Sequence, residues 1–441
     1  MNHAFTYRNG RLHIEDLAVD DLVAQTGSPV YLYSAAALLN RYNELKTAFA
    51  ELDPIVCYSI KSCSNIHLCR LLAEAGSGMD VVSGGELHRA KLAGADMSKI
   101  VFAGVGKTDA EITDAIESNI GWFNIESEAE FENIARIARQ LGKTARGALR
   151  INPDVDPETP HEKTTTGKKE SKFGVDIDRA KRFFTRYGRD EHLKLTAVHL
   201  HIGSPVYVTQ PYAKAITKAL ELINDLRADG FTIDTIDIGG GYGTDYTTGQ
   251  TPPFADYAKV IVPLLREFKA QGGTIIVEPG RSIAANAGLL VSQVQYLKQG
   301  GSKTFIILDT GMHHLIRPTL YDAFHFIWPT KVAAEHEPPA WAERLDLPGL
   351  QPCDVVGPIC ETGDYLALGR QLPPVARGDN LAVFSAGAYG MCMASHYNTL
   401  PRPAEVLVEG NTWRTIRQRE TYDDLLNHET AASTTPAQTS G

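Results

Sequence analysis

The stretch Ile55-Val-Cys-Tyr-Ser-Ile-Lys61 is a short apolar run that ends in a lysine, and seven comparable runs follow it along the chain. Most of the eight are almost continuously apolar, which is typical of parallel strands buried on both faces. We expect the strands at Ile55–Ser59, Met79–Ser83, Ile100–Ala103, Trp122–Ile125, Ala145–Ile151, Leu195–His201, Thr235–Gly239 and Thr274–Glu278.

Helix-like patterns separate these runs. Apolar residues recur every three or four positions in Glu86–Ala93, Glu128–Leu141 and Pro211–Ala228, as in helices with one buried face. Eight strand and helix units over about 225 residues fit an α/β fold with a closed (β/α)8 TIM-like barrel, which needs roughly 250 residues. A doubly wound open sheet is the alternative. In a barrel, residues that follow the strands converge at one mouth.

The pattern changes after Arg281, where β-type runs alternate with Gly and Pro and indicate a mainly antiparallel β domain. We expect the barrel at residues 31–285 and the β domain at 286–425, joined by one or more strands from residues 1–30. The last residues, 428–441, are rich in Ser, Thr, Ala and Gln, so we expect them to be disordered.

Composition narrows the class of function. The net charge of −10 argues against nonspecific binding to nucleic acid or to anionic membranes, and small-molecule chemistry is favoured. The sequence has no signal-like start and no apolar run of eighteen residues, so we expect a soluble protein. Reduced thiols and a cytoplasmic location are the simplest interpretation of six cysteines that are neither dense nor spaced as a zinc site.

Three strand ends carry groups that suit one cofactor. Gly239-Gly-Gly-Tyr-Gly243 can bring backbone N–H groups to a phosphate, Lys61 can form a Schiff base, and the carboxylate of Glu278 can keep a pyridine nitrogen protonated. Together they indicate pyridoxal 5′-phosphate, with His201 against the face of the ring. Each feature alone has a simpler explanation: a surface lysine, an ordinary glycine turn or a hydrogen-bonded histidine.

Six motifs occur in order along nearly the whole chain: Tyr58-Ser-Ile-Lys61, His199-Leu-His-Ile-Gly-Ser204, Gly239-Gly-Gly241, Glu278-Pro-Gly-Arg281, Gly357-Pro-Ile-Cys-Glu-Thr-Gly-Asp364 and Gly387-Ala-Tyr-Gly390. This set resembles the pyridoxal phosphate decarboxylases of the alanine racemase fold. The further motifs Asn152-Pro-Asp154, Ser171-Lys-Phe-Gly174, Leu315-Ile-Arg-Pro318 and Tyr397-Asn398 are most similar to the diaminopimelate decarboxylase family within that group.

The resemblance implies a role for each matching residue. Lys61 resembles the Schiff-base lysine, and Cys360 resembles the thiol that protonates the carbanion after carbon dioxide leaves. The implied cofactor-binding residues are Lys61, His201, Ser204, Gly241, Glu278, Pro279, Gly280, Arg281 and Tyr389. The implied substrate-binding residues are Arg281, Arg317, Tyr321, Glu361 and Tyr389. No metal is implied, and in the family the thiol comes from the second subunit, which implies a homodimer with shared active sites. By its spacing alone, Cys360 would be a buried structural cysteine.

The implied reaction converts meso-2,6-diaminopimelate to L-lysine and carbon dioxide, the last step of lysine biosynthesis. Arg317 suits the distal carboxylate of that substrate, and Glu361 suits its distal ammonium group. The alternative is a related decarboxylase that acts on ornithine, lysine, carboxynorspermidine or a carrier-bound glutamyl group. The loop Asn152–Gly174 is either a lid over the mouth or a solvated surface loop.

Some features depart from this pattern. The family usually has Asn-Asp where this chain has His313-His314, and Gln where it has Pro205, so the rim of the pocket is expected to differ. Two other classes of protein fit parts of the sequence: a metal-dependent hydrolase that uses His199-x-His201, and a cofactor-binding barrel without catalysis. The second class lacks the domain that carries Cys360 here.

Overall fold

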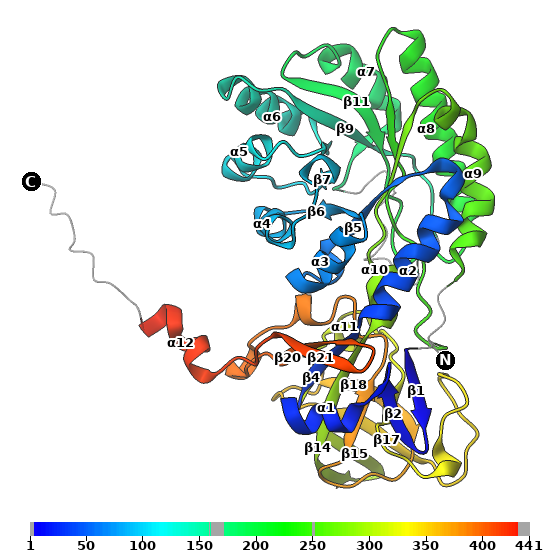
Figure 1. Cartoon of the computed structure of the whole chain (residues 1–441), viewed down its shortest axis with the longest axis vertical. Helices are drawn as coiled ribbons and strands as arrows, with labels where there is room; N and C mark the ends of the chain where they lie inside the picture. The colour runs from blue at the N-terminus through cyan, green and yellow to red at the C-terminus, as the bar shows by residue number, and fades with distance from the viewer. Residues whose placement is uncertain (1–3, 158, 160–171, 249–251, 431–441) are drawn as a thin grey trace, which may run out of the picture.

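The computed structural model describes residues 4–157, 159, 172–248 and 252–430 (Figure 1). Eight parallel strands close into a barrel, because the last strand in the sheet order, β8, pairs with both β7 and β9. This confirms the (β/α)8 barrel over the open sheet. The barrel strands are β5 (Ile55–Ser59), β6 (Gly78–Val81), β7 (Ile100–Phe102), β8 (Trp122–Ile125), β9 (Ala145–Asn152), β11 (Leu193–His199), β12 (Thr235–Asp237) and β13 (Thr274–Val277). The short β10 (Val175–Asp176) extends the sheet beside β9.

Helices surround this barrel in the upper part of Figure 1. Their first turns are held by side chains in several cases; for example, Ser83 accepts a hydrogen bond from the backbone of Glu86, and Thr108 forms a capping box with Glu111. No helix in the described ranges combines the length and the apolar composition of a membrane span. The surrounding helices are α2 (Ala35–Ala48), α3 (Ile66–Glu74), α4 (Gly84–Ala93), α5 (Asp109–Glu117), α6 (Glu128–Gln140), α7 (Ile177–Tyr187), α8 (Gln210–Ala228) and α9 (Phe254–Ala270).

The barrel interior is filled by side chains, so the barrel is a packed core rather than a pore. One buried cluster combines residues from six of the eight strands: Cys57, Val101, Trp122, Ala148, Ala197 and Ile276. Since this packed layer closes the interior, chemistry is confined to the mouth at the carboxyl ends of the strands.

The second unit is a mixed sheet that lies below the barrel in Figure 1. Most of its strand pairs are antiparallel, while β15–β17 and β4–β20 are parallel. Its main path is β18-β17-β15-β14-β4-β20-β21, and β19 joins β14 to β16. The strands are β4 (Val30–Ser34), β14 (Gly288–Gly300), β15 (Lys303–Leu308), β16 (Ile327–Pro329), β17 (Gln351–Val356), β18 (Tyr365–Leu372), β19 (Asn380–Val383), β20 (Ala404–Glu409) and β21 (Thr412–Arg417).

The N-terminal region contributes to this second unit. Strand β4 pairs with β14 and β20, so residues 31–34 lie in the second sheet and not in the barrel, where the predicted boundary put them. Strands β1 (Phe5–Arg8), β2 (Arg11–Ile14) and β3 (Leu17–Ala18) form a small sheet of their own, followed by α1 (Val19–Thr26). The remaining predicted domain boundaries stay a proposal.

The remaining α-helices of the described chain are short: α10 (Arg281–Ala284), α11 (Arg317–Tyr321) and α12 (Tyr422–Thr430). Helix α12 projects from the second unit at the left of Figure 1. It includes residues 428–430, so the prediction of disorder from residue 428 is wrong there. The reason is local: the side chains of Thr421 and Asp424 each bond the other's backbone N–H group and start the helix. Residues 431–441 lie outside the described residues.

Candidate active site

Lys61 lies at the barrel mouth, in a short 3-10 helix (Ile60–Ser62) that directly follows β5. Its Nζ is 2.7 Å from Oδ2 of Asp80 on the adjacent strand β6, a fully buried carboxylate that also accepts from Ser59 Oγ at 2.6 Å. Burial disfavours the charged lysine, but the negative charges of Asp80 and Glu278 outweigh it and raise the pKa of Lys61. The amine is therefore held as an ammonium that points at a buried acid.

Glu278 follows β13 and is 5% exposed. Asn124 Nδ2 donates to its Oε1 at 3.1 Å, and His199 Nε2 lies 3.3 Å from its Oε2. Burial opposes ionisation, yet His199 and Lys61 together hold the pKa of Glu278 well below its usual range. The pKa of neighbouring Asp237 is raised instead, by burial and by the charge of Glu278. Their surroundings thus favour the ionised form of Glu278 and the protonated form of Asp237.

The glycine turn after β12 packs against His201. Gly240 N–H donates to His201 Nδ1 at 3.3 Å, so that nitrogen is unprotonated. Burial and the nearby cation Arg150 lower the pKa of His201 to about 3, which keeps the ring neutral. Gly241 has φ +99°, and a Cβ there would lie 2.3 Å from the carbonyl oxygen of Gly203. Only glycine fits this position.

The Glu278-Pro-Gly-Arg281 segment continues directly into α10. The Pro279 carbonyl accepts from Ser59 N–H at 3.0 Å, and a Cβ on Gly280 would lie 2.8 Å from the Cβ of Ser59. The segment is therefore packed tightly against the end of β5, just before Lys61.

A cavity of about 730 Å³ opens at the mouth between the barrel and the second unit. Six predicted site residues line it: His201, Ser204, Arg281, Arg317, Tyr321 and Tyr389. Pro205, one of the departures from the family pattern, also lines it, as do Tyr207 and Tyr246. The backbone N–H of Tyr389 donates to the Ser62 carbonyl at 2.7 Å, which ties the cavity wall to the turn that carries Lys61.

Two buried arginines give this cavity a positive charge. Arg281 donates to Ser204 Oγ at 3.2 Å and to the Tyr246 hydroxyl at 2.9 Å, and its guanidinium lies 4.5 Å from the ring centre of Tyr389. Arg317 is 4.2 Å from the ring centre of Tyr246. Within the described ranges neither arginine forms an ion pair with a carboxylate. The two cations outweigh burial and lower the pKa of Tyr246. The cavity is therefore built to receive anionic groups.

Cys360 and Glu361 do not line this cavity. Both are exposed, on the loop that follows β17, and so the buried position that spacing alone indicated for Cys360 is wrong. The thiol contacts Asn398 Oδ1 at 3.4 Å, and Glu361 accepts a short hydrogen bond from the Tyr397 hydroxyl. The predicted thiol and distal anion are thus presented on the surface of their own chain.

Several residues at the site were not predicted: Asp80, Asn124, Asp237, Tyr246 and His325. Asp80 and Asn124 stand inside apolar runs, where an isolated polar residue was the available signal. Tyr246 and His325 had no comparable signal, because each lies in a loop and acquires its role only from tertiary contacts with the buried arginines, Tyr246 with Arg281 and Arg317 and His325 with Arg317.

The other departure from the family pattern, His313-His314, lies outside the cavity. Both imidazoles are buried, with ring centres 3.7 Å apart, and Ser395 N–H donates to the carbonyl oxygen of His313. The pair supports the loop that carries Tyr397 and Asn398. Most of the predicted lid, residues 152–174, lies outside the described residues.

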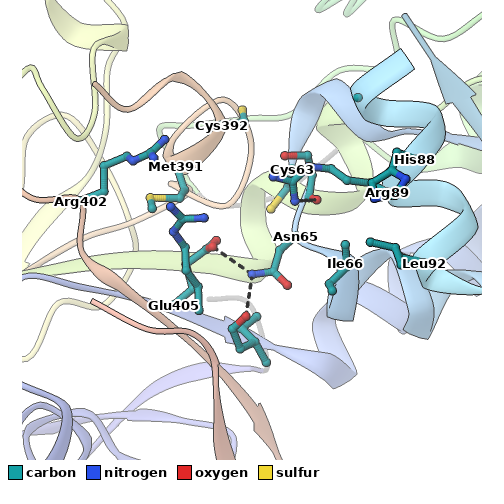
Figure 2. A pocket seen from close by; sticks show the side chains of 14 residues that line it. Cys63, Asn65, Ile66, His88, Arg89, Leu92, Met391, Cys392, Arg402 and Glu405 are labelled. Carbon is teal, nitrogen blue, oxygen red and sulfur yellow. Dashed lines mark hydrogen bonds between the residues drawn. The ribbon is translucent and has the colours of Figure 1, made fainter. Parts of the chain in front are cut away.

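A second cavity of about 450 Å³ lies between α3, α4 and the second unit (Figure 2). Met391 and Cys392 line it, whereas Tyr389 and Met393 line the first cavity, so one segment separates the two. At its floor Asn65 donates to the buried Glu405 at 2.9 Å. None of the predicted site residues lines this second cavity, whereas six of them line the first, so the first cavity is the candidate active site.

The comparisons with known proteins agree with this geometry. Residues 35–285 match the family model described as the pyridoxal binding domain of the pyridoxal-dependent decarboxylases. The fold and the site thus define a pyridoxal phosphate-dependent decarboxylase.

The diaminopimelate decarboxylase of Aquifex aeolicus is 46% identical over 426 residues, which cover 96% of this chain and 97% of that protein. The crystal structure of the Helicobacter pylori enzyme complexed with L-lysine has a TM-score of 0.86 and 38% identity, and covers 93% and 99% of the two chains. The enzyme from M. jannaschii has a TM-score of 0.89 and 35% identity, with 99% of both chains covered. This chain belongs to the diaminopimelate decarboxylase family.

Family membership also excludes the two other classes of protein, the metal-dependent hydrolase and the cofactor-binding barrel without catalysis. Donor atoms of His199, Asp237 and Glu278 lie within 4.8 Å of one another, a grouping that a metal-dependent hydrolase would use. The relatives, however, are decarboxylases, and they match nearly the whole chain. The match includes the second unit, which a cofactor-binding barrel without catalysis would lack.

Proposed function

We propose that the cavity lined by Arg281 and Arg317 is the centre at which this enzyme decarboxylates meso-2,6-diaminopimelate to L-lysine and carbon dioxide. The observation that carries this proposal is the pair of buried arginines without carboxylate partners in the described chain, at the same mouth as Lys61 and Glu278. Diaminopimelate has two carboxylates, one of which stays on the product.

The residues present fit pyridoxal 5′-phosphate. Lys61 supplies the amine, Glu278 an ionised acceptor for a protonated ring nitrogen, and His201 a neutral ring. The Gly241 turn, Ser204, Arg281 and Tyr389 would hold the phosphate. Bound there, the cofactor withdraws electrons from the substrate carbon that loses its carboxylate.

The enzyme's own groups then divide the remaining work. Asp80 accepts the hydrogen bond from Lys61 Nζ and can take up the proton that the amine must lose before it acts as a nucleophile. Asn124 and His199 orient the carboxylate of Glu278, so that its charge is fixed before any ligand binds. Arg317 and Tyr321 would bind the distal carboxylate of the substrate.

We further propose that the active unit is a homodimer in which Cys360 and Glu361 serve the partner's cavity. In the described chain both residues are exposed and neither lines the cavity of its own chain. Cys360 would return a proton to the carbon that lost its carboxylate, and Glu361 would bind the distal ammonium group.

We infer that the protein is located in the cytoplasm. Its six free cysteines are consistent with that reducing compartment.

The substrate proposal is tested by incubating the purified protein with pyridoxal phosphate and a panel of amino acids while carbon dioxide is measured. meso-Diaminopimelate should be turned over far faster than lysine or ornithine, because their single carboxylate must lie at the reacting carbon when they are decarboxylated, which leaves no second, distal carboxylate for Arg317. Preference for ornithine, lysine, carboxynorspermidine or a carrier-bound glutamyl group would contradict the substrate and leave the reaction class intact.

A further inference from the structure

Arg317 is oriented by a buried histidine. Its Nη1 is 2.8 Å from Nε2 of His325, and the two side chains are 7% and 0% exposed. An arginine has only donors, so His325 Nε2 must accept this hydrogen bond and carries no proton.

The other ring nitrogen fixes the same tautomer. His325 Nδ1 lies 2.8 Å from the carbonyl oxygen of Phe384, which can only accept, so Nδ1 carries the proton. Burial and the charge of Arg317 lower the pKa of His325 to about 3, in agreement with a neutral ring. The backbone carbonyl of Phe384, the residue that follows β19, therefore orients the imidazole of His325, and the imidazole orients the guanidinium of Arg317.

Among the described residues, the contacts of the Arg317 guanidinium come from two neutral groups. The ring centre of Tyr246 lies 4.2 Å from the guanidinium carbon, and Nε2 of His325 accepts a hydrogen bond from Nη1. A carboxylate in the place of His325 would orient the arginine equally well, but it would neutralise its charge and compete with an anionic ligand. A neutral acceptor supplies the orientation and leaves the full positive charge for the cavity.

We propose that His325 is a positioning residue that sets the enzyme's specificity for a substrate with a distal carboxylate. It acts through Arg317 and has no contact of its own with the reacting atoms. This inference rests on the proposed role of Arg317 in substrate binding.

Two substitutions separate the two hydrogen bonds of His325. Asparagine has an amide NH2 close to the position of Nδ1, so His325→Asn keeps the bond to Phe384 and loses the acceptor for Arg317. Glutamine has an amide oxygen close to the position of Nε2, so His325→Gln keeps the acceptor and is the matched control.

The readout is binding of L-lysine and cadaverine to the holoenzyme. Lysine retains the distal carboxylate of the substrate, whereas cadaverine is the same chain without it. His325→Asn should weaken lysine binding roughly tenfold and raise KM for diaminopimelate by a similar factor. The kcat, the cofactor absorbance and the affinity for cadaverine should stay near wild type, and His325→Gln should recover most of the lysine affinity.

Equal weakening of lysine and cadaverine, or loss of lysine affinity in both variants, would mean a merely structural role and would overturn the inference. Wild-type lysine affinity in His325→Asn would also overturn it. Arg317→Ala, measured in parallel, separates the two levels of the argument. If Arg317→Ala also binds lysine as wild type does, the proposed role of Arg317 fails; if it weakens lysine and His325→Asn does not, only the inference fails.

Discussion

The amine of Lys61 and the carboxylate of Asp80 form a 2.7 Å ion pair across adjacent barrel strands, with the acid completely buried. The charge of Asp80 is the largest influence that raises the pKa of Lys61 against the effect of burial. The pair therefore controls when the lysine is able to react as a nucleophile.

Asp80→Asn should lower the pKa of Lys61, because the amide removes the negative charge that favours the ammonium. The apparent pKa for covalent attachment of pyridoxal phosphate to the apoenzyme should shift down by about 1–3 pH units. Attachment is followed by absorbance, and borohydride reduction with peptide mapping identifies the lysine. A pyridoxyl group on a lysine other than Lys61 would contradict the site assignment.

Glu278→Gln should keep the cofactor bound but slow decarboxylation roughly tenfold to a hundredfold, because a neutral amide cannot hold a ring nitrogen protonated. The kcat is measured at saturating cofactor, with the absorbance as the check on occupancy. Unchanged kcat would show that the protonation of the ring is set elsewhere.

Mixing inactive Lys61→Ala with inactive Cys360→Ala should restore activity if the two residues meet across a dimer interface. Each heterodimer would contain one site with both residues intact, so random exchange predicts about a quarter of wild-type activity. Each variant alone is the control. Absence of recovery, with subunit exchange demonstrated by a tag, would place both residues in one chain.

Arg317→Ala should impair diaminopimelate turnover roughly tenfold to a hundredfold, the usual cost of losing a charge-assisted contact. Arg317→Lys retains the charge without the two parallel donors, so its kcat/KM for diaminopimelate should lie between that of Arg317→Ala and that of wild type. The ratio kcat/KM is measured for each variant at constant cofactor absorbance. An alanine variant that behaves like wild type would remove Arg317 from the substrate site.

His313 should make the fold sensitive to acid. Burial lowers its pKa to about 4, whereas the unfolded chain binds the proton near pH 6.5. The unfolded state therefore gains protons first, so stability is fully present above pH 6.5 and is lost as the pH falls toward 4. When the pH falls from 7 to 4.5, the free energy of unfolding should decrease more in wild type than in His313→Asn. The difference between the two decreases should be up to about 2 kcal/mol. An equal drop in both proteins would exclude His313 as a contributor.

The order of strands and helices could be predicted from the sequence, because the alternation of buried and amphipathic segments is a local property of the chain. The eight runs that begin with Ile55 became eight barrel strands, although β11 ends at His199 and leaves His201 in the loop beyond it. A strand from the N-terminal region was expected to join the second sheet, but periodicity could not give the partners of β4, because its pairing with β14 and β20 depends on segments more than two hundred residues away.

The sequence by itself determined the barrel, the candidate lysine and the class of cofactor, since these follow from motifs whose residues adjoin the ends of apolar runs. Only the tertiary structure decided which groups surround them. Asp80 controls Lys61, and His325 orients Arg317, because folding places their atoms within 3 Å in a buried setting. Hydrogen bonds and charge interactions of this kind depend on distance and burial, neither of which is encoded in spacing along the chain.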